Sequence, residues 1–322
     1  MMKRSMYRLL MIFACGCALA VPVFAAEMLV PGGNVVGLEL RGDTVTVAAF
    51  DQTLPSAREA GLRIGDEIVA IDGVDVDSAE DIRRALDRSD GDVELVVRRD
   101  GMESNISMAP DVTAEGPRLG VYLRQGITGI GTVTFYDPAT GCFGTLGHGV
   151  NDNTGALLDM TAGNVLPASV AAVERGQIGD PGQLRGRVSE DYALGSLSRN
   201  TARGVFGKLH AAPAGEAIPT AAAGEVHTGP AVIRSTVDDG GIREYAVEIV
   251  KVYPADRPDG RNLLLHVTDP ELLATTGGIV QGMSGSPIIQ DGKLIGAVTH
   301  VLVNDPTRGY GIFIENMLEA AG

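Results

Sequence analysis

Apolar runs of strand length recur along most of the chain, and turn-forming residue pairs separate them. Near the start, "NVVGLEL" and "TVTVAAF" read as strands, "GLRIGDEIVAIDG" adds a turn and a buried strand, and "DVELVVRR" closes the set. One amphipathic helix interrupts them, because Ser78 is a typical N-cap, Asp81 follows three residues later, and Ile82 and Leu86 share one face. Residues 27–112 are therefore predicted to form a small α/β domain.

The remaining residues, 113–322, follow the polar, proline-containing stretch "SMAPDVTAEGPRLG", which places a domain boundary near residue 112. Asp-Pro, Asp-Gly and Gly-Gly pairs lie between the apolar runs, where hairpins would turn. No long amphipathic helix appears until "IENMLEAA" at the end. Many short strands without alternating helices favour two barrels or a sandwich over an α/β sheet. The predicted fold class is mainly β.

The first 25 residues have the pattern of a secretory signal. Lys3, Arg4 and Arg8 precede an apolar run over residues 9–21, and Val23-Phe24-Ala25 has the small-residue spacing of a cleavage site. The run is close to spanning length, so an uncleaved membrane anchor is the alternative. In either case we expect the protein to be exported.

Charge and cysteine content exclude several kinds of partner and site. The formal net charge is -15, and loss of the three cations in residues 1–25 makes it more negative, which disfavours nucleic acid and leaves a peptide or protein partner. Only Cys142 lies beyond residue 25, so neither an intrachain disulfide nor a cysteine-built zinc site is expected. Without an HExxH motif or a close histidine pair, we predict no metal and no cofactor.

The stretch "GIVQGMSGSPIIQDGKLIGAVTH" places Ser284 in a glycine-rich turn. A serine nucleophile needs a base and hydrogen-bond donors for the developing oxyanion, and the N–H groups of Gly282 and Ser284 can point into one small space. Ser286 precedes Pro287 and is therefore expected to be extended, which makes it the weaker candidate. The Asp291-Gly292 hairpin that follows differs from the strand-turn-helix of an α/β hydrolase.

Among the five histidines, His148 in "GTLGHGVND" is the candidate base, because flanking glycines at the end of an apolar strand give access to it. His300 is the alternative, although it lies within the apolar run "GAVTHVLV", which favours a packed residue. A cysteine peptidase built on Cys142, six residues before His148, is a further alternative, but Cys142 has no glycine turn to supply an oxyanion site.

The small domain resembles a PDZ domain in "GLRIGDEIVAIDGVDV" followed by "SAEDIRRAL". The resemblance implies that a peptide adds to the sheet edge beside the helix. It also implies that Gly37, Leu38, Glu39 and Leu40 stand in place of the carboxylate-binding loop. The alternative is a domain that only docks on its neighbour.

The whole chain resembles the SpoIVB peptidases, through "GTLGHGVND" and "TGGIVQGMSGSPIIQDGKLIGAVTHVLVNDPTRGYGIFIENML". The resemblance implies a chymotrypsin-like double β-barrel in which His148 is the base, Ser284 the nucleophile and Asp269 in "LLLHVTDPELL" the orienting acid. Met283 replaces the Asp of the chymotrypsin-family "GDSGGP", so activation by a new N-terminus is not expected. Asp152 and Asp305 are alternative acids, and Asp269 is also placed to cap the short helix "DPELLATTGG".

The same resemblance implies a role in sporulation signalling. Such peptidases are exported from the forespore into the space between two membranes, process themselves near the N-terminus and cleave a membrane-embedded regulator of an intramembrane metalloprotease, which activates a late sigma factor. The alternative function is a PDZ adaptor whose peptidase domain is inactive.

Overall fold

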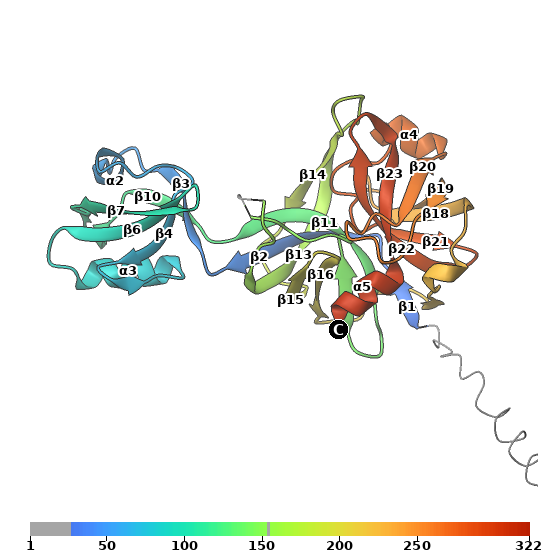
Figure 1. The fold of residues 1–322 in the computed structure, drawn as a ribbon, viewed down its shortest axis with the longest axis horizontal. Coiled ribbons are helices and arrows are strands. Elements are labelled where there is room, and N and C mark those ends of the chain that lie inside the picture. The colour runs from blue at the N-terminus through green and yellow to red at the C-terminus, as the bar shows by residue number, and fades with distance from the viewer. Residues whose placement is uncertain (1–26, 153–154) are drawn as a thin grey trace, which may run out of the picture.

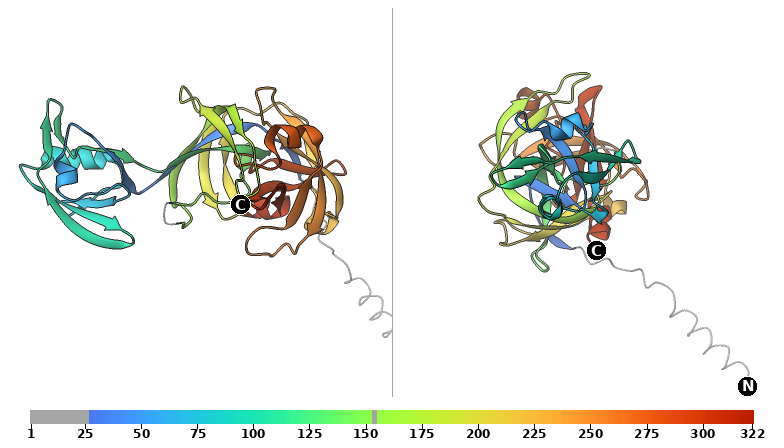
Figure 2. Two further views of the ribbon diagram at one scale, coloured as in Figure 1. Left: turned by 90° about the horizontal axis from the view of Figure 1, so that it is seen from above. Right: turned by 90° about the vertical axis from the view of Figure 1, so that its left-hand side faces the viewer.

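A computed structural model describes residues 27–152 and 155–322, and the expected leader at residues 1–25 lies outside them. Two β-barrels pack side by side, and a smaller domain projects from one of them at the end of two strands (Figures 1 and 2). No helix within the described residues is long and apolar enough to cross a membrane.

The first barrel is a closed ring of antiparallel strands around an apolar core. In ring order the strands are β2 (Val35–Gly42), β11 (Ile127–Tyr136), β12 (Cys142–Thr145), β16 (Gly204–Leu209), β15 (Gly195–Thr201) and β13 (Met160–Glu174). Three further strands flank the ring, namely β1 (Met28–Pro31), β14 (Gln183–Val188) and β17 (Ile218–Pro219).

The second barrel is closed by the pairing of its first strand with β21. Its strands in ring order are β18 (Gly229–Ser235), β19 (Arg243–Val252), β20 (Leu263–Val267), β23 (Asp305–Phe313), β22 (Lys293–Leu302) and β21 (Pro287–Gln290). The helical segments η1 (Ala223–Glu225), α4 (Pro270–Thr276) and α5 (Ile314–Ala321) accompany it. The predicted double-barrel, mainly β fold is confirmed.

The small domain has one sheet, in which β10, β3, β4, β6 and β7 lie in that order and β5 pairs with β4. Its elements are β3 (Val45–Phe50), α2 (Ser56–Glu59), β4 (Glu67–Ile71), β5 (Val74–Asp75), α3 (Ala79–Arg88), β6 (Val93–Arg99), β7 (Met102–Met108), β8 (Asp111–Thr113), β9 (Gly116–Arg118) and β10 (Val121–Arg124). Ser78 caps α3 by accepting a hydrogen bond from the Asp81 N–H, and the helix buries Ile82 and Leu86, as the sequence predicts.

The small domain is inserted into the first barrel between β2 and β11. These two strands pair from Ile127 opposite Leu40 to Thr132 opposite Val35, and the chain between them forms the domain. Its boundaries therefore differ from the predicted 27–112. Strands β1 and β2 belong to the barrel, whereas β10, beyond the predicted boundary, completes the small sheet by pairing with β3.

Candidate active site

Ser284 lies in the turn between α4 and β21, and two glycines shape this turn. Gly282 and Gly285 have φ values of +97° and +96°, in the region that favours glycine. A Cβ on Gly285 would lie 2.0 Å from the carbonyl oxygen of Thr132 in β11. Gly285 is therefore required because a strand of the first barrel approaches the turn this closely.

Three threonines of the first barrel, all fully buried, hold this turn. Thr132 Oγ1 donates to the Gly282 carbonyl at 2.9 Å and Thr134 Oγ1 to the Gly285 carbonyl at 2.8 Å, while Thr145 Oγ1 donates to the Thr132 carbonyl at 2.6 Å. They anchor the candidate nucleophile across the barrel interface. These threonines were not predicted from the sequence, although the alternation in "GTVTF" places Thr132 and Thr134 on one face of a strand.

The turn leaves two backbone donors free beside Ser284. Among the described residues, no hydrogen bond uses the N–H of Gly282 or of Ser284, whereas the Met283 N–H between them donates to the Val280 carbonyl at 3.1 Å. These two free groups are the predicted oxyanion donors. The Ser284 hydroxyl itself donates to the Thr299 carbonyl at 2.8 Å.

His148 follows β12 and has a defined tautomer. Its Nδ1 lies 2.9 Å from the carbonyl oxygen of Gly149. A carbonyl only accepts hydrogen bonds, so Nδ1 carries the proton and Nε2 keeps a lone pair that can take one. Burial lowers the pKa of His148 below its usual value, and the hydrogen bond to Gly149 partly opposes this. A neutral imidazole of this tautomer is the form that a general base requires.

The two candidate reacting side chains, which come from different barrels, line one cavity. His148 and Ser284 both border a cavity of about 350 Å³, together with Gly282. In the described part of the chain no hydrogen bond joins the two side chains, and the serine hydroxyl donates to the Thr299 carbonyl instead.

A second imidazole lies beside the first. The rings of His148 and His300 are 5.2 Å apart at their centroids, and Nδ1 of His300 is buried without a hydrogen-bond partner. Burial lowers the pKa of His300 to about 4, and repulsion from Arg261, and from His148 whenever it is protonated, acts in the same direction. His300 is therefore a neutral neighbour of the candidate base near pH 7.

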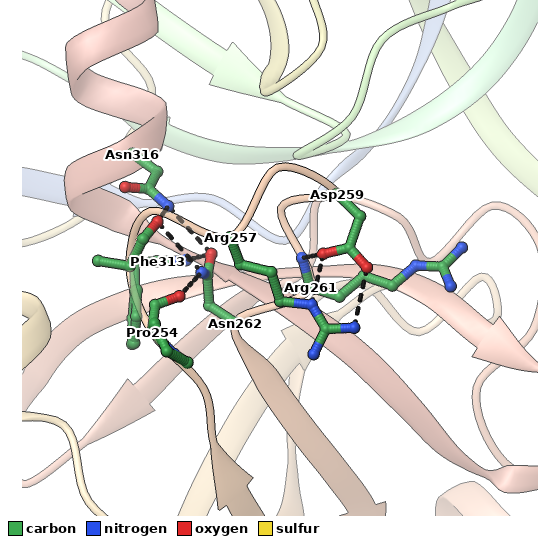
Figure 3. A network of polar contacts seen from close by, with 8 residues as sticks. Pro254, Arg257, Asp259, Arg261, Asn262, Phe313 and Asn316 are labelled. Atoms are coloured by element: carbon green, nitrogen blue, oxygen red, sulfur yellow. Dashed lines mark hydrogen bonds and ion pairs between the residues drawn. The ribbon is translucent and has the colours of Figure 1, made fainter.

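Arg261, whose charge acts on His300, lies in the loop between β19 and β20 (Figure 3). Asn262, fully buried, donates to the Pro254 carbonyl at 2.7 Å and accepts from Asn316 Nδ2 at 3.0 Å. The Arg261 N–H donates to Asp259, and its guanidinium lies 5.2 Å from the Tyr310 ring. The loop thus fixes a cation on the side of the site that carries His300.

Asp269 is the N-cap of α4. Its carboxylate accepts from the N–H groups of Glu271 at 2.9 Å, Leu272 at 3.0 Å and Ala246 at 3.2 Å. In the described part of the chain, no hydrogen bond or ion pair joins it to His148, whose Nδ1 has the Gly149 carbonyl as partner. Its role as triad acid stays a prediction, and the capping role is observed.

The two alternative acids also have local partners. Asp305 accepts from Thr307 Oγ1 at 2.5 Å and pairs with Arg308 at 3.3 Å. Asp152 accepts from the Ala156 N–H at 3.1 Å. In this structure the Gly149 carbonyl sets the tautomer of His148. The family resemblance, in contrast, implies that a carboxylate does so.

Replacing Asp269 separates its two roles. Asparagine caps a helix about as well as aspartate, so Asp269→Asn should leave stability unchanged, whereas Asp269→Ala should lose about 1 kcal/mol. We expect kcat/KM of Asp269→Asn to fall less than about tenfold, because its charge does not contact His148. Thermal unfolding and peptide hydrolysis measure the two effects. A loss of about 10⁴ in a stable Asp269→Asn protein would instead show that the carboxylate orients His148.

Two competing nucleophiles are poorly placed. Ser286 is fully buried, with its hydroxyl 3.1 Å from that of Ser235. Burial raises the pKa of the half-buried Cys142 thiol, and Asp137 adds to this, so the reactive thiolate is disfavoured. Neither residue borders the cavity shared by His148 and Ser284.

The predicted carboxylate-binding loop needs correction. Gly37, Leu38, Glu39 and Leu40 lie within β2, where they pair with β11 on one side and β13 on the other. Glu39 accepts from Arg41 and Asn164, and Leu38 and Leu40 line the cavity next to Ser284. These residues therefore belong to the first barrel and cannot bind a peptide terminus in the small domain.

A groove of the small domain lies elsewhere, between α3 and the edge strand β10. A cavity of about 530 Å³ opens there, beside the turn from Arg118 to Gly120, where Gly120 has a φ of +74°. Its apolar lining includes Ile82, Leu86 and Val121. An unpaired strand edge beside a helix is the arrangement that receives an extended peptide. This groove was not predicted because the predicted domain ended before β10.

Comparison with known families matches both parts of the chain. A family model described as SpoIVB peptidase S55 matches residues 115–318, and a PDZ domain model matches residues 55–99. Both matches agree with the double barrel and with the inserted domain.

Similar individual proteins cover less. A "Putative zinc metalloprotease" of Rhizobium meliloti (strain 1021) is 29% identical over 115 residues, which are 35% of this chain and 29% of that protein. Another of the same description, from Agrobacterium fabrum, is 38% identical over 78 residues, 24% of this chain and 21% of that protein. The chain thus spans less than a third of the length of either relative.

Solved structures resemble the chain only loosely. The Rv3671c protease of M. tuberculosis, in an inactive form, covers 59% of this chain and 82% of its own, with 13% identity and a TM-score of 0.35. A serine-to-alanine mutant of the same protein gives 14% identity, covers 59% of this chain and 79% of its own, and has a TM-score of 0.35.

Proposed function

The chain belongs to the SpoIVB peptidase S55 family, a family of serine peptidases, and we propose that it is an endopeptidase in which Ser284 is the nucleophile and His148 the general base. The observation that carries this proposal is the cavity that both side chains line, beside two free backbone N–H groups. Base, nucleophile and oxyanion donors are the three parts that acyl transfer needs.

Acylation begins when the Ser284 hydroxyl turns from the Thr299 carbonyl toward Nε2 of His148. Nε2 takes the proton as Oγ bonds to the substrate carbonyl carbon, and the carbonyl oxygen becomes an oxyanion held by the N–H groups of Gly282 and Ser284. His148 then returns the proton to the departing amine as the C–N bond breaks, which leaves an acyl-serine.

Deacylation repeats these steps with water in place of the amine. His148 takes a proton from the water as its oxygen bonds to the acyl carbon, and then gives it back to Ser284 Oγ as the ester breaks. The Nδ1 proton stays on the ring and remains hydrogen-bonded to the Gly149 carbonyl throughout. The imidazole therefore keeps one orientation during both half-reactions.

The inactive PDZ adaptor remains the second candidate. Its support is that the Ser284 hydroxyl is hydrogen-bonded to the Thr299 carbonyl and the Asp269 carboxylate caps α4, so neither contacts His148 through a hydrogen bond among the described residues. A fluorophosphonate probe separates the two functions. An endopeptidase forms a covalent adduct on Ser284, whereas an inactive domain stays unlabelled in the full-length protein.

The inserted domain is proposed to bind a peptide along β10. The peptide would add its backbone to this edge strand, its terminal carboxylate would lie near Arg118 and Gly120, and an apolar side chain would enter between Ile82 and Leu86. We propose this as the contact with a protein substrate or with a segment of the same chain.

Peptide binding should depend on the free terminus. We expect a fluorescein-labelled heptapeptide ending in Leu-Val to bind the Ser284→Ala protein at least about tenfold more tightly than its amidated form, because an amide loses the charge on the bound end. Arg118→Ala should weaken the acid form, and Arg98→Ala, on β6 outside the groove, should not. Fluorescence anisotropy measures this, and equal affinity of both peptides would contradict it.

We further propose that the enzyme is exported, acts in sporulation signalling from the forespore intermembrane space, processes its own N-terminal region, and cleaves a membrane-embedded regulator of an intramembrane metalloprotease. The support is family membership and the signal-like pattern in residues 1–25. N-terminal sequencing of wild type and Ser284→Ala from the expressing cells tests the self-processing, since only wild type should show the processed end.

A further inference from the structure

The cavity beside Ser284 has apolar walls from the first barrel. Among the described residues that line it there is no Asp, Glu, Lys or Arg. The polar lining residues are His148, Asn151, Gln281 and Ser284. The walls consist of Leu38 and Leu40 of β2, Ile127 and Ile130 of β11, and Leu146 and Val150 around the base.

One of the leucines that line this cavity has an unusual backbone conformation. Leu146 has a φ of +68°, in the left-handed region that a leucine adopts only at a cost. Its side chain is buried against Gly131, where an added Cβ would lie 2.4 Å from Leu146 Cδ2 and 3.1 Å from Leu38 Cδ1. Bare backbone on β11 thus makes room for Leu146.

Backbone strain of this kind persists where the surrounding structure requires it, and it concentrates at functional sites. Glycine would adopt this conformation without strain, as Gly147 does at a φ of +69°. A leucine at this position, two residues before the base, therefore contributes a side chain that the site uses. That side chain fills space that an occupant of the cavity would otherwise use.

We propose that this cavity is the subsite for an aliphatic side chain, leucine or methionine above all, on a residue next to the cleaved bond, and that Leu146 sets its depth. The inference rests on the proposed peptidase function. The occupant belongs to the substrate because the cavity is continuous with the nucleophile, the base and Gly282. A charged side chain would lose water without gaining a partner there, so the enzyme should reject it.

Cleavage profiling of a bacterial peptide library by mass spectrometry tests the subsite, with Ser284→Ala as background. We expect Leu and Met at one of the two positions flanking the cleaved bond to exceed Asp, Glu, Lys and Arg at least about tenfold. Leu146→Gly, which removes both strain and side chain, should shift that position alone toward Phe and Tyr at least about tenfold. The half-buried Ile130→Ala should shift it in the same direction.

Asp291→Gly is the matched control. Asp291 also has a positive φ, +51°, but it is exposed in the turn between β21 and β22 and does not border the cavity. Its profile should match wild type. Absence of cleavage above background by wild type would overturn the peptidase function itself. Cleavage beside charged residues, or an unchanged profile in folded Leu146→Gly and Ile130→Ala, would overturn only the subsite.

Discussion

Ser284→Ala is expected to abolish peptide hydrolysis, with a loss in kcat on the order of a million-fold. Only the hydroxyl oxygen can form the acyl-serine, and the remaining donors would give a small residual rate over water. Stability should fall by no more than about 1 kcal/mol, because the change removes one hydrogen bond, from Oγ to the Thr299 carbonyl. Hydrolysis assays and thermal unfolding of the same preparations measure both effects.

Ser286→Ala serves as the control for this change. Ser286 lies two residues further along the same turn and is fully buried, and its hydroxyl donates to that of Ser235. Fluorophosphonate labelling should therefore persist in Ser286→Ala and vanish in Ser284→Ala. Labelling that vanishes in the Ser286 variant and persists in the Ser284 variant would show that Ser286, and not Ser284, is the nucleophile.

Local signals predicted most of the elements, because each depends on neighbouring residues. Ser78 and Asp81 predict the start of α3, Asp269 before Pro270 predicts α4, and the Asp291-Gly292 pair predicts the hairpin of β21 and β22. In each case a side chain or a turn conformation satisfies backbone groups within a few residues. Strand periodicity then gave the mainly β fold class, and family resemblance gave the double barrel.

The pairing of "NVVGLEL" was not predictable in the same way. Its apolar pattern predicts a strand, but its partners, β11 and β13, lie more than eighty residues away in the sequence, beyond an entire inserted domain. Proximity to the next strand in the sequence therefore suggested the wrong sheet. This one misplacement moved the predicted peptide loop into the barrel and hid the groove beside β10.

The site was predictable to the extent that glycine marks it. Three glycines, Gly282, Gly285 and Gly147, mark the segments that carry Ser284 and His148. Glycine is needed at these positions because other backbone or side-chain atoms approach closely, and not simply to give access to the site. The orienting partner of His148 was less accessible to sequence reasoning. A backbone carbonyl, here that of Gly149, leaves no residue type to recognise, and Asp269 was named as the acid only through the family resemblance.

His148→Gln is expected to lower kcat nearly as much as loss of Ser284, on the order of a million-fold. Glutamine retains hydrogen bonding but takes no proton, so the serine remains a weak nucleophile. In wild type, the acidic limb of the kcat/KM profile should fall below pH 6.5. Burial lowers the pKa of His148 below its usual value, so the neutral base persists to lower pH before protonation inactivates it.

His300→Gln distinguishes the two neighbouring imidazoles under the same assay. The ring of His300 lies 5.2 Å from that of His148, but His300 does not border the cavity of Ser284, so its loss should cost less than about tenfold in kcat. If His300 were the base, the two variants would exchange their effects, and the acidic limb would lie near pH 4, where the pKa of His300 is held. Loss of activity in His148→Gln with activity retained in His300→Gln identifies His148 as the base.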